Sequence, residues 1–226
     1  MLRAVIFDFD GVITDSEILH YRAFNEVLAH YGVELTKQDY YKTYLGLSDV
    51  DCYKLLIKQG KLSIGPTQID SLVQQKDLVF KKLAQTEGHI IEGVRDFLNL
   101  LAKNNIPMAI CSGALLSEIE LILEEAALRA FFEVVVSAEQ VKRGKPSPEG
   151  FLLVLKKLNH SRKPLIRATE CVVIEDSHWG LRAAEAAKMH TVAVTNTYDA
   201  DQLAQAEKIV GRLSELTIND LQQFCR

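Results

Sequence analysis

The chain has 226 residues, of which 48% are hydrophobic and 25% charged, and its formal net charge is −4. This balance is typical of a soluble globular protein, and the mild negative charge argues against a non-specific binder of nucleic acid or of an anionic membrane. We therefore expect a cytoplasmic monomer with no nucleic-acid and no membrane partner. The cysteines are scattered along the sequence, which is typical of reduced thiols in a cytosolic protein.

The first predicted element is a buried strand, Ala4–Phe9, with two carboxylates at its end. Asp8 and Asp10 can project to the same side because side chains alternate along a strand. Two acids in this position repel each other and are costly to desolvate unless a cation lies between them. The pattern favours a chemical role, although the short Asp-x-Asp-Gly tetrad alone is also compatible with solvated turn residues.

The next predicted segment is entirely helical. Its expected helices are Glu17–Tyr31, Lys37–Leu45, Asp49–Gln59 and Gln68–Thr86. The expected N-caps of the first three are Ser16, Thr36 and Ser48. This segment is far longer than one crossover between parallel strands requires. The sequence therefore predicts a helical domain at residues 16–88, inserted into a core domain of residues 1–15 and 89–226; one elaborate domain with extra helices is the alternative.

The rest of the chain alternates between short apolar runs and helical patterns. The further predicted strands are Ile106–Cys111, Glu133–Ser137, Cys171–Glu175 and Thr191–Val194. The predicted helices are Val94–Lys103, Leu115–Glu125, Pro148–Leu158 and Gly180–Lys188. Apolar runs without polar alternation indicate strands that are covered on both faces. We therefore expect an α/β fold, with a doubly wound, Rossmann-like parallel sheet.

Polar residues follow the carboxyl ends of four predicted strands. They are Asp8 and Asp10, Ser112 and Gly113, Lys145, and Glu175 with Asp176. Because these ends share one edge of a parallel sheet, we expect the groups to converge. The carboxylates suit a hard cation such as Mg²⁺, and the serine, its neighbouring amides and the lysine suit a phosphoryl group. With a metal present, an aspartate could attack phosphorus and form an aspartyl phosphate.

The motifs at these strand ends occur in a fixed order. They are Asp8-Phe9-Asp10-Gly11-Val12, Ser112-Gly113, Lys145-Pro146 and Glu175-Asp176-Ser177-His178-Trp179-Gly180. In this order they resemble the signature motifs of haloacid dehalogenase (HAD) superfamily phosphohydrolases, and the resemblance spans nearly the whole chain. It implies a HAD core with the helical insertion as a cap domain.

The resemblance also implies roles for individual residues. Asp8 would be the nucleophile, and Asp10 the general acid and then the general base. Ser112 and Lys145 would hold the transferring phosphoryl group. The implied cofactor is Mg²⁺, held by Asp8, the backbone carbonyl of Asp10, Glu175 and Asp176. Ser112 as a simple helix N-cap is an alternative that can coexist with this role.

The stretch from Gly11 to Glu17 is similar to the β-phosphoglucomutase-like subgroup, which includes sugar-phosphate and phosphoglycolate-type phosphatases. In true mutases an arginine follows the cap's Gly-x-Ser, whereas Asp49 stands in that position here. A lysine expected near the second motif is also missing. A mutase must anchor a second phosphate, which an acid would repel.

The sequence therefore favours a Mg²⁺-dependent phosphatase for small phosphomonoesters over a β-phosphoglucomutase-type mutase. A non-catalytic phosphometabolite-binding protein is a third, less favoured possibility. The expected partner is a small phosphorylated metabolite, because a cap would close over the site and exclude water. The candidate substrate-binding residues are Gly11, Gly113, His20, Gly46 and Ser48. His20 is equally compatible with a partly buried helix histidine.

Overall fold

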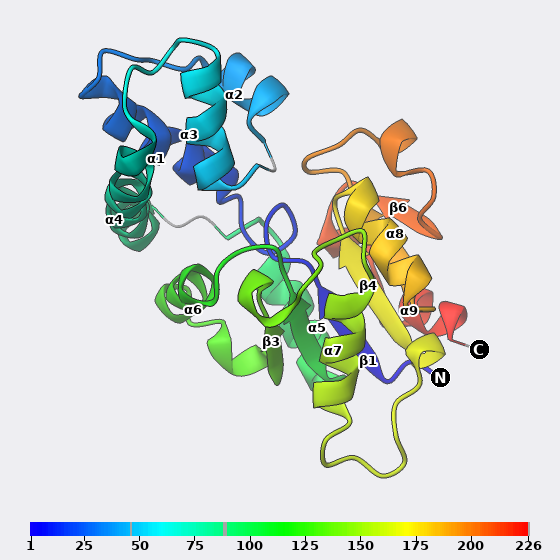
Figure 1. Cartoon of the computed structure of the whole chain (residues 1–226). Coiled ribbons are helices and arrows are strands. Elements are labelled where there is room, and N and C mark those ends of the chain that lie inside the picture. The colour runs from blue at the N-terminus through cyan, green and yellow to red at the C-terminus, as the bar shows by residue number, and fades with distance from the viewer. Residues whose placement is uncertain (46, 88–89, 226) are drawn as a thin grey trace. The chain divides into compact units, whose positions relative to one another are not determined.

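The computed structural model describes residues 1–45, 47–87 and 90–225. The chain divides into two compact units, one of Met1–Asp15 with His89–Arg226 and one of Ser16–Gly88. The first unit is of the α/β type and carries the polar strand ends, and the regular elements of the second are helical (Figure 1).

Within the described residues, the α/β unit contains a six-stranded sheet in the order β3-β2-β1-β4-β5-β6. The strands are β1 (Ala4–Phe7), β2 (Met108–Cys111), β3 (Val134–Val136), β4 (Cys171–Glu175), β5 (His190–Val194) and β6 (Lys208–Val210). Every neighbouring pair is parallel. The predicted doubly wound α/β fold is confirmed, and β6 is an additional edge strand that the sequence prediction missed.

Helices follow the strands of this unit. They are α5 (Val94–Lys103), α6 (Leu116–Glu125), α7 (Glu149–Leu158), α8 (His178–Ala186) and α9 (Ile218–Phe224). The last of these was not predicted. The others match the predicted helices to within two residues at each end, which is the usual uncertainty of a helix boundary.

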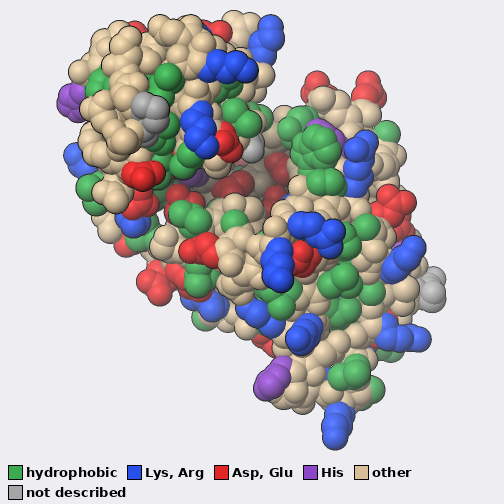
Figure 2. Space-filling model, viewed as in Figure 1, with side chains coloured by type: hydrophobic (Ala, Val, Ile, Leu, Met, Phe, Trp, Pro, Cys, Tyr) green, Lys and Arg blue, Asp and Glu red, His purple; other side chains and the backbone are tan. Residues whose placement is uncertain are grey.

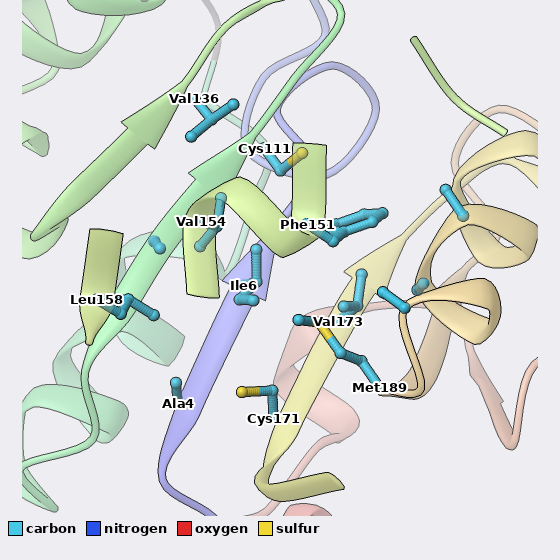
Figure 3. Packing of buried hydrophobic residues seen from close by; sticks show 14 of the residues in the cluster. Ala4, Ile6, Cys111, Val136, Phe151, Val154, Leu158, Cys171, Val173 and Met189 are labelled. Atoms are coloured by element: carbon cyan, nitrogen blue, oxygen red, sulfur yellow. The ribbon is translucent and has the colours of Figure 1, made fainter. Parts of the chain in front are cut away.

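The sheet is covered on both faces. On one face, Ile6 of β1 packs in a buried cluster with Phe151 and Val154 of α7 (Figure 3). On the other face, the ring of Phe7 makes edge-to-face contacts with Phe97 of α5, with ring centroids 6.1 Å apart. Successive residues of β1 therefore enter different apolar layers, which explains why its sequence does not alternate with polar residues.

The regular elements described in the second unit are helical, as expected. They are α1 (Glu17–Ala29), α2 (Lys37–Thr43), α3 (Asp49–Lys58) and α4 (Ile69–Glu87), with a short 3₁₀ turn at Pro66–Gln68. The predicted N-caps Thr36 and Ser48 are confirmed, because their hydroxyls accept the amides of Asp39 and Asp51. Ser16 is not a side-chain cap, since its own backbone is already helical (φ −80°, ψ −17°) and a cap requires an extended residue.

The surface carries mixed charge. On the face of the α/β unit shown in Figure 2, Lys and Arg side chains are interspersed with Asp and Glu side chains. None of the helices in the described ranges combines the length and the apolar character needed to cross a bilayer.

A matched pair of leucines on α7 tests the packing of the sheet. Leu158 is 1% exposed and Leu152 is 46% exposed. Leu158→Ala should lower the free energy of unfolding by about 2–5 kcal/mol, because it leaves a cavity in the core. Leu152→Ala should change it by less than about 0.5 kcal/mol. Urea unfolding followed by circular dichroism measures both; equal effects would contradict this packing.

Candidate active site

Three carboxylates meet at the carboxyl edge of the sheet. Asp8, Glu175 and Asp176 each offer an oxygen, and these oxygens all lie within 4.8 Å of one another. The pairing of β1 with β4 brings them together, because Phe7 lies opposite Ile174 and the amide of Asp8 donates to the Ile174 carbonyl. Of the four acids that the sequence predicted to converge from these two strands, Asp8, Glu175 and Asp176 do so.

Lys145 contacts two of the three acids. Its Nζ lies 2.6 Å from Oδ1 of Asp8 and 2.5 Å from Oε1 of Glu175, and 5.5 Å from the ring centroid of Phe151. Burial alone would lower the pKa of the Lys145 ammonium, but the two carboxylates raise it above its ordinary value. Lys145 is therefore a fixed positive charge beside the carboxylate of Asp8.

The site remains short of positive charge. Within the described residues, the ion pairs of these three acids all involve Lys145. Burial, together with the charge of Glu175, raises the pKa of Asp8 to about 6. Burial also raises the pKa of Asp176 well above its usual range, and Asp8 and Glu175 add to that effect. A cation bound among these oxygens would relieve both shifts.

Glu175 is held by the start of α8 as well as by Lys145. Its Oε2 accepts a hydrogen bond from the Ser177 hydroxyl at 2.9 Å. It also accepts hydrogen bonds from the backbone amides of Asp176 and Ser177, at 3.2 Å each. The same hydroxyl accepts the amide of Gly180 and so caps α8. This network fixes the orientation of the Glu175 carboxylate, which in turn fixes Lys145.

Two glycines leave room for these carboxylates. A Cβ on Gly11, whose φ is +75°, would lie 1.8 Å from Oδ2 of Asp176. A Cβ on Gly180 would lie 1.7 Å from Oε1 of Glu175. At both positions a side chain would displace an acid of the site. Glycine therefore lets the backbone approach these acids closely at both positions.

The other predicted residues of this unit have distinct surroundings. Ser112 is buried after β2, and its hydroxyl accepts the amide of Ala114 at 2.9 Å. It is not the N-cap of α6, a position that Leu115 occupies. A Cβ on Gly113 would meet nothing within 4 Å. Asp10 forms a backbone bridge with Thr14 and lies outside the group of three carboxylates.

Three of the candidate substrate-binding residues belong to the helical unit, and their surroundings differ. Gly46 lies outside the described residues. The hydroxyl of Ser48 is engaged in capping α3 and lies 2.7 Å from Oδ2 of Asp51. The ring of His20 stacks on Phe80, with centroids 4.2 Å apart. Ser48 thus has a clear structural role, and His20 belongs to a buried polar cluster.

Lys76 is the centre of that cluster and was missed in the sequence. Its side chain is 1% exposed, and its Nζ lies 3.0 Å from Oδ1 of Asp49 and 2.5 Å from Nδ1 of His20. A lysine on a long helix is usually solvated. The sequence did contain a signal for its burial. Lys76 lies four residues after Leu72 and four before Phe80, so it shares with them the apolar face of α4. The pairing also means that the charge of Asp49 is already balanced.

The fold is a doubly wound parallel sheet that carries a group of acids, and with it a candidate metal site, at its carboxyl edge. This is the edge at which α/β enzymes of this architecture bind their ligands. The chain matches the sequence model of the haloacid dehalogenase-like hydrolases over residues 5–194, and it belongs to that family. The predicted family is therefore confirmed.

Within this family, the chain is similar to enzymes that act on phosphorylated compounds. The chain is 33% identical over 159 residues to the chloroplastic 5-amino-6-(5-phospho-D-ribitylamino)uracil phosphatase of Arabidopsis thaliana; the match covers 70% of this chain and 41% of that protein. It is 29% identical over 225 residues to the phosphorylated carbohydrates phosphatase of Thermotoga maritima, covering 98% and 99%. A solved β-phosphoglucomutase from Clostridium difficile matches with a TM-score of 0.80 and 25% identity, over 100% of this chain and 97% of that one. The prediction of an enzyme of the HAD phosphatase type is confirmed.

Replacing Gly180 tests the packing around Glu175. In an ordinary helix, Gly→Ala stabilises by about 1 kcal/mol. Here the new Cβ would overlap the Glu175 carboxylate, so Gly180→Ala should instead destabilise by about 1–3 kcal/mol. Gly144→Ala is the control, since its Cβ would meet nothing within 4 Å. Thermal unfolding of both variants gives the answer, and a stabilised Gly180→Ala protein would disprove the contact.

The half-buried His20 leads to a prediction of how the stability of the helical unit depends on pH. Burial and then the charge of Lys76 lower the pKa of His20 well below its ordinary value of 6.5. The folded state therefore keeps His20 neutral where the unfolded chain protonates it, so stability should fall as the pH drops below about 6.5. The loss approaches about 1.4 kcal/mol per pH unit until the folded-state pKa is reached.

His20→Gln keeps a hydrogen-bonding side chain but does not titrate. Urea unfolding of the wild type and of this variant should be compared at pH 7.5, 6.5 and 5.5. Because all other titrating groups are common to both proteins, the difference between the two curves isolates His20. We expect the wild type to lose stability relative to the variant at the lower pH values, and parallel curves would contradict the assignment.

Proposed function

We propose that this enzyme is a Mg²⁺-dependent phosphatase that hydrolyses small phosphomonoesters through an aspartyl phosphate on Asp8. The observation that supports it most directly is the position of the Lys145 ammonium, 2.6 Å from Asp8 within a buried group of acids. Such a pair offers a carboxylate nucleophile and a cation for the phosphoryl oxygens in one place. Family membership and the phosphatase names of the relatives support the same reaction.

The donor set of the site fits a magnesium ion. Its ligands would be carboxylate oxygens of Asp8 and Asp176 and the backbone carbonyl of Asp10, with Glu175 binding directly or through water. Oxygen donors and excess negative charge are what this hard cation requires. When bound, the ion would neutralise Asp8 and the substrate phosphate together, so that like charges can approach.

The reaction would proceed in two steps, in which side chains of this chain act as nucleophile, acid and base. The Asp8 carboxylate attacks phosphorus, and the leaving ester oxygen takes a proton from Asp10. In the second step Asp10 removes a proton from a water molecule, whose oxygen attacks phosphorus and releases phosphate and free Asp8. Ser112 and Lys145 hold the phosphoryl oxygens in both steps.

We further propose that residues 16–88 act as a cap domain on a core of residues 1–15 and 89–226, and that they select the substrate. The candidate contacts remain Gly11 and Gly113 in the core, and His20, Gly46 and Ser48 in the cap. The relatives named above act on phosphorylated carbohydrates and on a phosphorylated ribitylaminouracil. We therefore expect a small phosphorylated metabolite as substrate.

A mutase is the second candidate, favoured by the likeness to β-phosphoglucomutase along the whole chain. Against it, Asp49 occupies the position of the arginine expected in true mutases, and its partner Lys76 is committed to it at 3.0 Å. Faster conversion of β-glucose 1-phosphate to glucose 6-phosphate than release of phosphate would establish the mutase.

Asp8→Asn tests the nucleophile. Loss of the attacking carboxylate should reduce phosphate release from a sugar-phosphate panel by at least about a thousandfold, since the covalent step is removed. Mass spectrometry of the quenched wild type should find one added phosphoryl group on Asp8. Asp201→Asn makes the same chemical change at an exposed position and should retain activity. Turnover at the wild-type rate in Asp8→Asn would refute the mechanism.

A further inference from the structure

The turn after β5 reaches the active site through two exposed side chains. Nδ2 of Asn196 donates to the carbonyl of Gly11 at 2.7 Å, and the hydroxyl of Thr197 hydrogen-bonds to the carboxylate of Asp176. The strand was predicted from the sequence, but no role was predicted for the residues at its carboxyl end. These contacts add a fifth strand end to the four that carry the motifs.

Three segments meet at one point with no spare room. A Cβ built on Gly11 would lie 1.8 Å from Oδ2 of Asp176 and 2.8 Å from Oγ1 of Thr197. The segments after β1, β4 and β5 are therefore in mutual contact there. A shift of the turn after β5 would move both the Asp176 carboxylate and the backbone that follows Asp10.

Ordinary packing does not account for these two side chains. Asn196 and Thr197 are both exposed, so they bury little apolar surface. Their polar atoms are nevertheless directed at a backbone carbonyl and a carboxylate of the site. A hydroxyl that donates to one side of a carboxylate restricts its rotation, as outer-shell partners of metal ligands do.

We propose that Asn196 and Thr197 are positioning residues of this active site. Thr197 fixes the Asp176 carboxylate in the orientation that binds the metal ion, and Asn196 holds the Gly11 backbone and with it the preceding Asp10. This inference rests on the proposed Mg²⁺-dependent function. Thr197 contributes to the affinity for the metal ion, and Asn196 contributes to the placement of the acid–base residue Asp10.

The first test measures metal binding without turnover. Mg²⁺ is titrated into the metal-free protein by calorimetry, with the fluorescence of Trp179, the chain's one tryptophan, as a second readout. Thr197→Val keeps the shape of the side chain but removes the hydroxyl, and should weaken Mg²⁺ binding about tenfold. Thr197→Ser restores the hydroxyl and should bind within about twofold of the wild type.

The matched control is Thr169→Val. Thr169 is also exposed, but it precedes β4 and so belongs to the opposite edge of the sheet. This variant should bind Mg²⁺ as the wild type does. Equal affinities of wild type and Thr197→Val, or a loss that Thr197→Ser does not rescue, would overturn the role of Thr197.

The second test separates Asn196 from Thr197. Asn196→Leu removes the donating amide without adding a charge. At saturating Mg²⁺ it should lower kcat about tenfold while the KM for the phosphomonoester changes less than twofold, which separates an effect on Asp10 from any change in metal affinity. A wild-type kcat in this variant would overturn the role of Asn196. A wild type that releases phosphate equally well without Mg²⁺ would instead overturn the metal part of the proposed function, so the two failures are distinguishable.

Discussion

The contact between the Lys145 ammonium and the carboxylates of Asp8 and Glu175 is the constraint on which the site depends. Three buried acids close together would repel one another and lose their hydration, so a fixed cation must accompany them. Lys145 supplies it from the loop before α7, and Glu175 is itself anchored by Ser177. The charge that remains on the acids makes the site a candidate for a further cation.

Packing of the apolar sheet holds these acids close together in spite of their mutual repulsion. Strands β1 and β4 are buried along their whole length and pair in register, so their carboxyl ends cannot separate without disrupting the core. The acids are held in mutual proximity by that packing, not by attraction for one another. The carboxylates also need space beside the backbone. Gly11 leaves room for Asp176 and Gly180 for Glu175, because neither glycine carries a Cβ.

The sequence was informative where chemistry and secondary structure coincide. Apolar runs separated by helical patterns predicted the parallel sheet. The acids at the ends of these runs then predicted the meeting of Asp8 with Asp176, because strand ends are shared along one edge. Strand β6 was missed because it begins with a charged lysine and offers only two apolar residues in a row, whereas the equally short β3 is three valines. Lys76 and Thr197 were missed for another reason: their importance lies in long-range contacts, which a local pattern of residue types does not encode.

Lys76 also shows why a residue-by-residue comparison with relatives can misjudge charge. Considered by position alone, Asp49 places a free acid where a mutase needs a cation. In the structure the acid is paired with buried Lys76, and His20 beside it is kept neutral because its pKa is lowered. The Asp49–Lys76 pair is therefore close to neutral, so it neither repels a second phosphate strongly nor anchors one. The case against a mutase consequently rests on the missing arginine and on the missing lysine near the second motif, and not on repulsion by Asp49.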